Sequence, residues 1–121
     1  MNITYHDKAV PVSPYPGLTR LLTMDRQFGS GAITQGMVTI DPGMLVRPHT
    51  HLVEESITLL EGDVKVLVGS ETVEVRGRRA TFLAPANVVH GLRNIGTTPA
   101  VICIAYPSVQ VAVMMAEGVE I

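Results

Sequence analysis

The sequence predicts an all-β domain, and three observations support this class. Eleven glycines and eight prolines interrupt the 121 residues at short intervals, which suits short strands better than helices. No segment of useful length carries an apolar stripe with the helical period of about 3.6 residues. Thr72–Arg76 instead alternates polar and apolar residues, as a strand with one solvated face does. Short strands with a turn signal about every eight to twelve residues are typical of a sandwich or barrel.

An N-terminal extended arm is expected over residues 1–17, before a single domain that spans residues 18–121. The arm contains three of the eight prolines, which exclude a helix interior and a central strand because proline lacks an amide N–H. Turns rich in glycine and proline separate the strands that follow, and Asp41-Pro42-Gly43 and Gly96-Thr97-Thr98-Pro99 are examples.

These turns leave nine segments that we predict as strands. They are Leu18–Met24, Ile33–Ile40, Leu45–His51, Ser56–Leu60, Val64–Val68, Thr72–Arg76, Ala80–Leu83, Val88–Arg93 and Ala100–Tyr106. Gly69-Ser70 has the composition of a tight hairpin loop between two of them. The apolar segment Val109–Met115 is compatible with a further strand or with a short terminal helix.

Composition and charge restrict the classes of partner. Hydrophobic residues make up 46% of the chain and charged residues 17%, as in a compact folded protein. Nine basic and eleven acidic residues give a formal charge of −2, which argues against nucleic acid or an anionic membrane as partner. We find no secretory signal, and no apolar stretch approaches the roughly 20 residues of a membrane helix. We therefore expect a soluble, cytoplasmic protein.

Two of the four histidines lie in His49-Thr50-His51. Residues two apart on a strand project to the same face, so both imidazoles point together. Continuing in steps of two reaches Glu55, whereas Glu54 falls on the other face. Two imidazoles and a carboxylate on one inward face would form an open metal site, and a cation would offset the cost of burying the carboxylate. The alternative is an exposed strand histidine beside a surface glutamate.

The spacing around these residues resembles the two motifs of the cupin superfamily. The first motif is G-x5-H-x-H-x3,4-E-x6-G, and its fixed positions are filled by Gly43, His49, His51, Glu55 and Gly62. The second is G-x5-P-x-G-x2-H-x3-N, and Pro85, His90 and Asn94 match it. Asn87 replaces the middle glycine, a substitution that a left-handed backbone tolerates, and Arg79 replaces the leading one.

The resemblance implies a conical double-stranded β-helix, or jelly-roll barrel. It also implies that His49, His51, Glu55 and His90 are the four ligands of one divalent transition-metal ion. Three imidazoles and one carboxylate suit Mn, Fe, Ni, Cu or Zn without choosing among them. Small cupins commonly pair through edge strands, so we expect a homodimer.

Most of the other polar and aromatic side chains that we considered have two interpretations. Arg47 shares the parity of His49, so it is either a contact for a substrate anion or, as we favour, a charge at the barrel rim. Gln35 and Met37 either line the pocket or are ordinary sheet residues. Tyr106 is placed to cap the pocket or an interface. The arm residues Tyr5 and Tyr15 are expected to pack on a neighbouring surface.

A metal-dependent enzyme acting on a small organic acid or carbonyl compound is the function that the resemblance favours, with an oxygenase as its first form. A metal-dependent lyase or isomerase, or a small-ligand-binding cupin without turnover, is the alternative. The sequence places no lysine or tyrosine as a second base, which favours chemistry centred on the metal. Trp is absent and aromatic residues are only 4%, which argues against an aromatic platform for long sugars.

Overall fold

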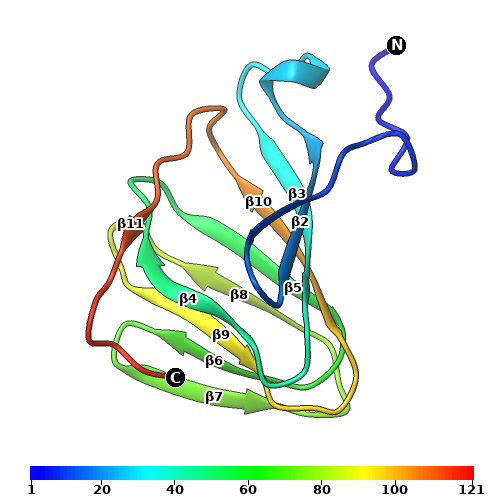
Figure 1. Ribbon diagram of the computed structural model, residues 1–121. Coiled ribbons are helices and arrows are strands. Elements are labelled where there is room, and N and C mark those ends of the chain that lie inside the picture. Colours follow the sequence, from blue (N-terminus) through cyan, green and yellow to red (C-terminus); the bar gives the residue numbers. More distant parts are fainter.

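The computed structural model describes all 121 residues, and Figure 1 shows a protein built almost entirely of strands. The strands are β1 (Val12–Tyr15), β2 (Leu18–Met24), β3 (Thr34–Ile40), β4 (Leu45–Thr50), β5 (Glu55–Glu61), β6 (Val64–Val68), β7 (Glu71–Val75), β8 (Ala80–Ala84), β9 (His90–Asn94), β10 (Ala100–Tyr106) and β11 (Met114–Met115). One 3-10 helix, η1 (Arg26–Phe28), follows β2. The chain has no helix with the length and apolar character that crossing a bilayer requires.

The strands form two antiparallel sheets that face each other. One sheet has the order β1-β2-β3-β10-β5-β8, and the other has the order β11-β4-β9-β6-β7. Strands distant in the chain are neighbours in both sheets, as with β3 and β10 or β4 and β9. This arrangement confirms the predicted all-β jelly-roll barrel (Figure 1).

The hydrophobic core lies between the sheets and consists of inward-facing residues of alternating strands. Its members are Leu18, Val38, Ile40, Ile57, Leu59, Val64, Val66, Val75, Ala84, Leu92, Ala100, Ile102 and Ile104. In β3 and β10, buried residues alternate with more exposed ones, because successive side chains of a strand point to opposite faces. The alternating apolar residues of these strands thus determine which face of the sheet packs against the core.

The N-terminal arm contributes one strand that we did not predict. Val12–Tyr15 forms β1 and pairs with β2 at the edge of the first sheet. Pro14 is compatible with this position, because an edge strand leaves some amide groups without a ladder partner. The turn between the two strands uses Gly17 with a φ of 87°, a conformation that favours glycine. Residues 12–15 therefore extend the sheet toward the cavity described below.

Two other elements differ from the sequence prediction in detail. The 3-10 helix η1 was not predicted, and its N-cap is Asp25, whose side chain accepts a hydrogen bond from the amide of Gln27. The C-terminal segment that we assigned to a strand or helix is mostly irregular, with only Met114–Met115 pairing to β4 as β11. Asn87 has the left-handed conformation expected from the second motif, with a φ of 62°.

A β-bulge interrupts the pairing of β4 with β9. Val46 pairs with Leu92, but His49 pairs with His90, so β4 has one more residue than β9 across this stretch. The bulge contains Pro48, which has no amide N–H for the ladder. It shifts the alternation of β4, and both Val46 and His49 consequently line the same cavity.

Candidate metal centre

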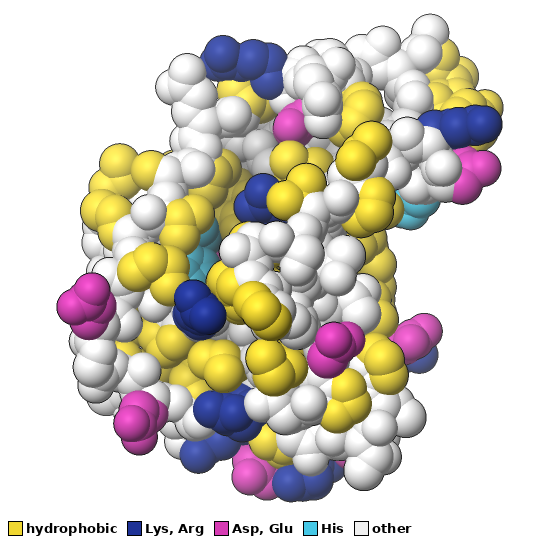
Figure 2. Space-filling view, in the orientation of Figure 1, with side chains coloured by type: hydrophobic (Ala, Val, Ile, Leu, Met, Phe, Trp, Pro, Cys, Tyr) yellow, Lys and Arg dark blue, Asp and Glu magenta, His cyan; other side chains and the backbone are white.

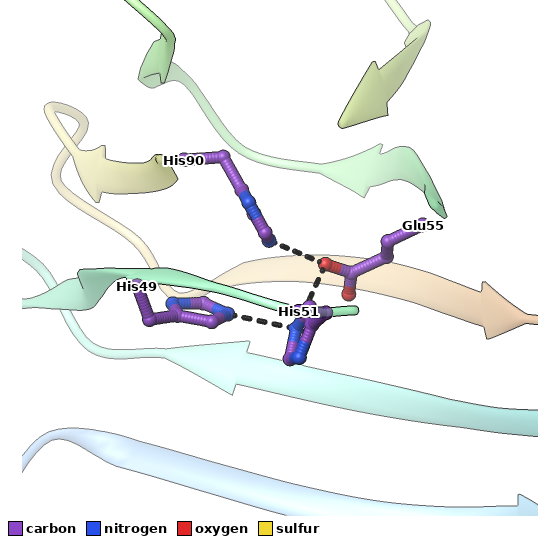
Figure 3. A group of neighbouring side chains, drawn as sticks. All are labelled: His49, His51, Glu55 and His90. Carbon is purple, nitrogen blue, oxygen red and sulfur yellow. Dashed lines mark hydrogen bonds and ion pairs between the residues drawn. The ribbon is translucent and has the colours of Figure 1, made fainter. Parts of the chain in front are cut away.

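Four buried side chains from three parts of the barrel meet at one point. His49 lies near the end of β4, His51 follows that strand, and Glu55 and His90 begin β5 and β9. Each is between 1% and 8% exposed. Their ligand atoms all lie within 4.8 Å of one another, and Figure 3 shows the three rings and the carboxylate turned toward a common centre.

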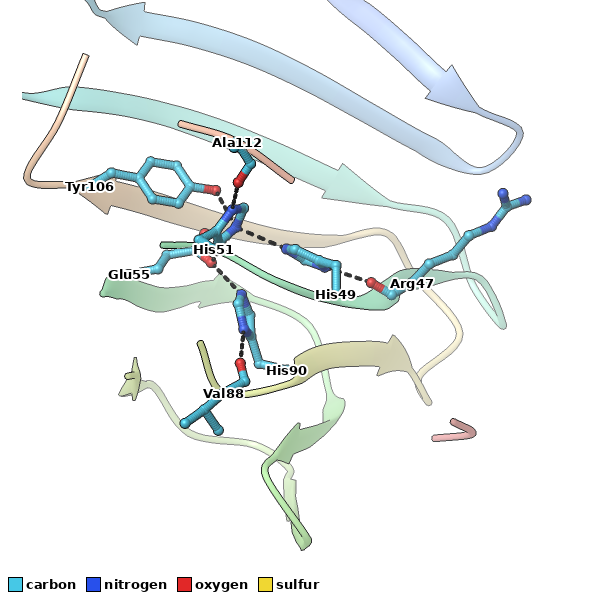
Figure 4. A network of polar contacts seen from close by, with 8 residues as sticks. All are labelled: Arg47, His49, His51, Glu55, Val88, His90, Tyr106 and Ala112. Carbon is cyan, nitrogen blue, oxygen red and sulfur yellow. Dashed lines mark hydrogen bonds and ion pairs between the residues drawn. The ribbon is translucent and has the colours of Figure 1, made fainter. Parts of the chain in front are cut away.

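Backbone carbonyls fix the tautomer of all three histidines. Each ring places its Nδ1 within hydrogen-bond distance of a carbonyl oxygen, as Figure 4 shows. The carbonyls belong to Arg47 for His49 at 2.6 Å, Ala112 for His51 at 2.8 Å, and Val88 for His90 at 3.0 Å. A carbonyl only accepts, so each Nδ1 must carry the proton and donate it. In the neutral ring, Nε2 is then left with a free lone pair.

The three Nε2 atoms point at each other and at the carboxylate. His49 Nε2 lies 3.0 Å from His51 Nε2, and Glu55 Oε1 lies 2.8 Å from His90 Nε2 and 3.6 Å from His51 Nε2. Lone pairs and a negative charge at these distances repel unless a proton or a cation lies between them. Atoms bound to one ion at about 2.0–2.2 Å are at most about 4.4 Å apart. The cluster therefore has the donor types to hold a metal ion, and the separations of 2.8–3.6 Å lie inside this limit while the full spread of 4.8 Å is slightly wider.

Burial and hydrogen bonding shift the protonation of this cluster. Burial lowers the pKa of His49 to about 4, so this ring is neutral at pH 7. Burial also disfavours the charged form of His51, but the nearby Glu55 carboxylate and the Ala112 carbonyl together outweigh this and raise the pKa of that imidazole. For Glu55, burial opposes ionisation, yet the neighbouring polar groups of His51, His90 and Tyr106 lower the carboxyl pKa to about 2. The carboxylate is thus ionised and ready to bind a cation.

Tyr106 brings a hydroxyl to the cluster. It lies at the end of β10, and its hydroxyl oxygen is 3.3 Å from His51 Nε2. The two rings pack edge to face with centroids 4.9 Å apart. Burial and the nearby negative charge of Glu55 raise the pKa of this hydroxyl. Tyr106 thus takes the first of the two positions expected for it, in the pocket, and it brings to the metal residues a hydroxyl that the sequence did not indicate as a second base, because β10 lies beside β5 only in the folded sheet.

The cluster forms part of the wall of a cavity of about 340 Å³. Figure 2 shows the opening, with histidine side chains visible inside it and basic side chains on either side. Eleven of its nineteen lining residues are hydrophobic. The polar and charged lining residues outside the cluster are Tyr15, Arg20, Arg47 and Tyr106. The site is therefore an apolar pocket with a few polar groups, which is typical of small-molecule sites.

Arg47 and Tyr15 form the rim of this cavity. The guanidinium carbon of Arg47 lies 4.1 Å from the centre of the Tyr15 ring, and the Tyr15 hydroxyl accepts a hydrogen bond of 2.9 Å from the Arg47 amide. Arg47 is exposed, which agrees with the rim charge that we favoured. Tyr15, which was expected to pack on a neighbouring surface, packs on the barrel beside Arg47, because β1 folds back along β2.

Arg20 was not predicted to line the cavity, whereas Gln35 and Met37 were considered as possible pocket residues. Arg20 lines the cavity from β2, and its signal was a charge at the same parity as the core residue Leu18. Gln35 and Met37 do not line this cavity. Glu55 is buried and Glu54 exposed, but the step-of-two argument does not explain this, because the chain leaves β4 after Thr50 and changes sheet.

Comparison with known proteins places this geometry in a family. The family model of the cupin domain matches residues 36–106. No curated protein sequence matches the chain. Among solved structures, KdgF from Halomonas sp. is 20% identical with a TM-score of 0.71, and the alignment covers 87% of this chain and 92% of that one. The polyketide cyclase RemF from Streptomyces resistomycificus is 18% identical with a TM-score of 0.77, with coverages of 99% and 88%.

A third similar structure is the oxalate decarboxylase of Bacillus subtilis. It is 20% identical with a TM-score of 0.79, and the alignment covers 91% of this chain but 30% of the decarboxylase. Identities at this level show a shared fold and not a shared reaction. The cupin-domain match spans more than half of the chain and includes all four residues of the metal-binding cluster. The chain accordingly belongs to the cupin family.

Proposed function

We propose that this protein is a metal-dependent enzyme that acts on a small organic acid or carbonyl compound in the cavity. The observation that carries the proposal is the orientation of the three histidines. All three Nδ1 atoms are used by backbone carbonyls, which leaves three Nε2 lone pairs and the Glu55 carboxylate facing one point of the cavity wall. Ligand histidines in metal sites are commonly held by such a hydrogen bond at the second ring nitrogen.

One divalent transition-metal ion fits this donor set. His49, His51, Glu55 and His90 would hold it, and Mn, Fe, Ni, Cu and Zn are all compatible with three imidazoles and a carboxylate. The Bacillus subtilis oxalate decarboxylase has Mn(II) centres, which supports manganese as one candidate here. Such an ion supplies Lewis-acid polarisation of a bound oxygen, or activation of a water molecule.

Tyr106 adds a hydrogen-bond donor beside the metal residues, which favours a reaction that builds negative charge on a substrate oxygen. Its hydroxyl lies in the cavity 3.3 Å from His51 Nε2, so it can donate a hydrogen bond to a substrate oxygen beside the metal residues. We therefore put a lyase, isomerase or cyclase reaction first. The names of the polyketide cyclase and the oxalate decarboxylase, neither of which denotes an oxygenase, are consistent with this order.

An oxygenase is the second candidate, because the donor set also suits iron and copper. Four protein ligands leave positions free on a six-coordinate ion, and the cluster opens onto the cavity. Oxygen uptake with a panel of diketones, catechols and thiols separates the two candidates. Uptake that depends on one of these compounds would favour the oxygenase, whereas conversion without uptake would favour the lyase or isomerase. A cupin that binds ligands without turnover would convert none of them.

Elemental analysis of purified protein tests the metal centre. We expect one ion per chain in the wild type and in His6→Ala, since His6 is an exposed residue of the N-terminal arm. His49→Ala and His90→Ala should each remove most of the metal while circular dichroism still shows a folded sheet. Wild-type metal content in both cluster variants would refute the ligand assignment.

We also propose a homodimer with a cytoplasmic location and a small-molecule partner, as the sequence led us to expect. The edge strands β1 and β8 support a dimer, because they expose Val12 at 50% and Leu83 at 56%, and an unpaired sheet edge favours association. Light scattering on the purified chain would test it. A monomeric mass at micromolar concentration would contradict the dimer.

A further inference from the structure

Arg20 is a half-buried cation in an otherwise apolar part of the cavity wall. It lies on β2 opposite the core residue Val38, on the face that carries Leu18. Its guanidinium takes part in none of the ion pairs of the protein, which use Arg76, Glu74, Glu55 and two histidines. None of the side-chain hydrogen bonds near the metal-binding cluster uses it either.

Two observations place Arg20 near the metal-binding cluster. Arg20, Tyr106 and Glu55 line the same cavity. The positive charge of Arg20 also acts on the Tyr106 hydroxyl and opposes the rise in the pKa of that group. The guanidinium is therefore within Coulombic range of a hydroxyl that lies 3.3 Å from a ring nitrogen of the cluster. A molecule that fills the cavity would meet both the metal residues and this unpaired cation.

The rest of the cavity wall is apolar. Most of its members are aliphatic, among them Leu18, Val38, Ile57, Ile102 and Ile104. The aliphatic side chains offer no hydrogen bonds to the several hydroxyls of a sugar acid. The wall has only the hydroxyls of Tyr106 and of Tyr15, which already accepts from the Arg47 amide, so most sugar hydroxyls would be buried without a partner at a cost in binding energy. The aliphatic side chains suit an aliphatic or aromatic body. The volume of about 340 Å³ is near the lower end of small-molecule sites.

We propose that Arg20 binds the carboxylate of a substrate whose remaining body is apolar, so that the enzyme takes an apolar carboxylic acid and discriminates against sugar acids. This inference rests on the proposed function, because it names the substrate class of the same site. A guanidinium presents a rigid fork of donors that matches a carboxylate. Arg47 is less suited to the task, since it is exposed and lies against the Tyr15 ring at the rim.

Binding of trans-cinnamate, followed by ligand-observed NMR titration, tests this inference. The neutral analogue cinnamamide and the sugar acid galacturonate are the comparison probes. We expect cinnamate to bind about 10- to 100-fold more tightly than cinnamamide, which corresponds to one charge-assisted contact. It should also bind more tightly than galacturonate, which keeps the carboxylate but would bury hydroxyls without partners. Arg20→Met should remove the preference for cinnamate over cinnamamide, and Arg20→Lys, which retains the charge but not the fork, should restore part of it.

Arg78→Met is the matched control for the loss of one positive charge. Arg78 is exposed in the loop between β7 and β8 and does not line the cavity, so this variant should keep the wild-type preference. Galacturonate binding as tight as that of cinnamate would overturn the apolar substrate class. If Arg20→Met still prefers cinnamate over cinnamamide, Arg20 does not bind the carboxylate. Arg20 also borders a second hollow under the N-terminal arm, and its side chain would then belong to that hollow. If only Arg47→Met removes the preference for cinnamate over cinnamamide, the carboxylate is bound by Arg47 at the rim instead.

The same titration separates this inference from the proposed function. Each variant is measured as purified, with its metal content, and again after chelation. If the purified protein holds no metal, the proposed enzyme is refuted, but the comparison of cinnamate with cinnamamide in chelated wild type and Arg20→Met still decides the role of Arg20. If metal is present, but wild type and Arg20→Met each bind cinnamate and cinnamamide with equal affinity, only the inference about Arg20 fails.

Discussion

Gly91→Ala should lower the metal affinity, although Gly91 is not one of the four ligands. Gly91 lies in β9 beneath the bulge of β4, and a Cβ there would lie 2.7 Å from the carbonyl oxygen of Val46 and 3.2 Å from the nitrogen of Pro48. The first distance is about 0.7 Å short of an ordinary van der Waals contact. Both atoms belong to backbone held in the sheet, so β4 must move away from β9. The same Cβ would also meet Ile121, whose flexible side chain can turn aside.

The expected cost follows from this overlap. Forcing a methyl group into a packed site typically costs about 1–3 kcal/mol, which for a chain of this size is a fall in Tm of about 4–12 °C. The displaced strand carries His49, whose partner across the ladder is His90. Because ligand atoms must be held closely in place, we expect metal affinity to fall by about tenfold or more.

Thermal unfolding and a metal titration measure both effects. Gly31→Ala is the matched control, since a Cβ at Gly31 meets nothing within 4 Å and its φ is not positive. We expect the control to keep the wild-type Tm and metal affinity. If Gly91→Ala also keeps both within error, the close approach of β4 to β9 does not position the ligands, and the argument from the bulge is wrong.

Three further perturbations test the polar network around the cluster. Tyr106→Phe should leave metal content unchanged but lower turnover of any substrate by about 10- to 100-fold, since it removes the hydroxyl beside His51; equal turnover would exclude the hydroxyl from the reaction. Deletion of residues 112–121 should weaken metal binding by about 10- to 100-fold in a chelator competition, because it removes the carbonyl that orients His51; an unchanged affinity would show that this bond is dispensable. Metal affinity should also fall with decreasing pH. The raised pKa of His51 means that its ring holds a proton up to above pH 6.5, and the metal must displace that proton. We expect a loss of about tenfold per pH unit below the pKa of His51 and little change above it; calorimetry in buffers of different ionisation enthalpy would show the released proton, and a flat profile from pH 5 to 8 would contradict it.

The alternation of apolar residues was sufficient to predict most strands, because burial of one sheet face imposes a period of two. It failed where the backbone departs from regular pleating. Arg47 and His49 share parity in the sequence, yet the bulge at Pro48 separates their environments, leaving Arg47 exposed and His49 buried. A bulge adds one residue without a distinct sequence signal. Only the resemblance to a family, with its fixed spacing, indicated that both histidines point inward.

The residues around the metal cluster depended on contacts between distant strands. Tyr106 reaches His51 because β10 pairs with β5, which begins at Glu55. Arg20 reaches the cavity because β2 continues the same sheet through β3. Neither pairing can be derived from local pattern, since register between strands far apart in the chain is set by the closed barrel. A charged residue at an inward position of β2 was nevertheless a signal, as a guanidinium there needs a partner.

The C-terminal segment joins metal binding to the shape of the cavity. It leaves the first sheet at Tyr106, passes the cluster, and joins β4 of the second sheet as β11 (Figure 1). Ala112 fixes the tautomer of His51 through its carbonyl, and the neighbouring Val113 lines the cavity. One short stretch of backbone therefore orients a ligand and closes a wall. A change that moves this segment away from the cavity therefore also removes the hydrogen-bond partner of the His51 Nδ1.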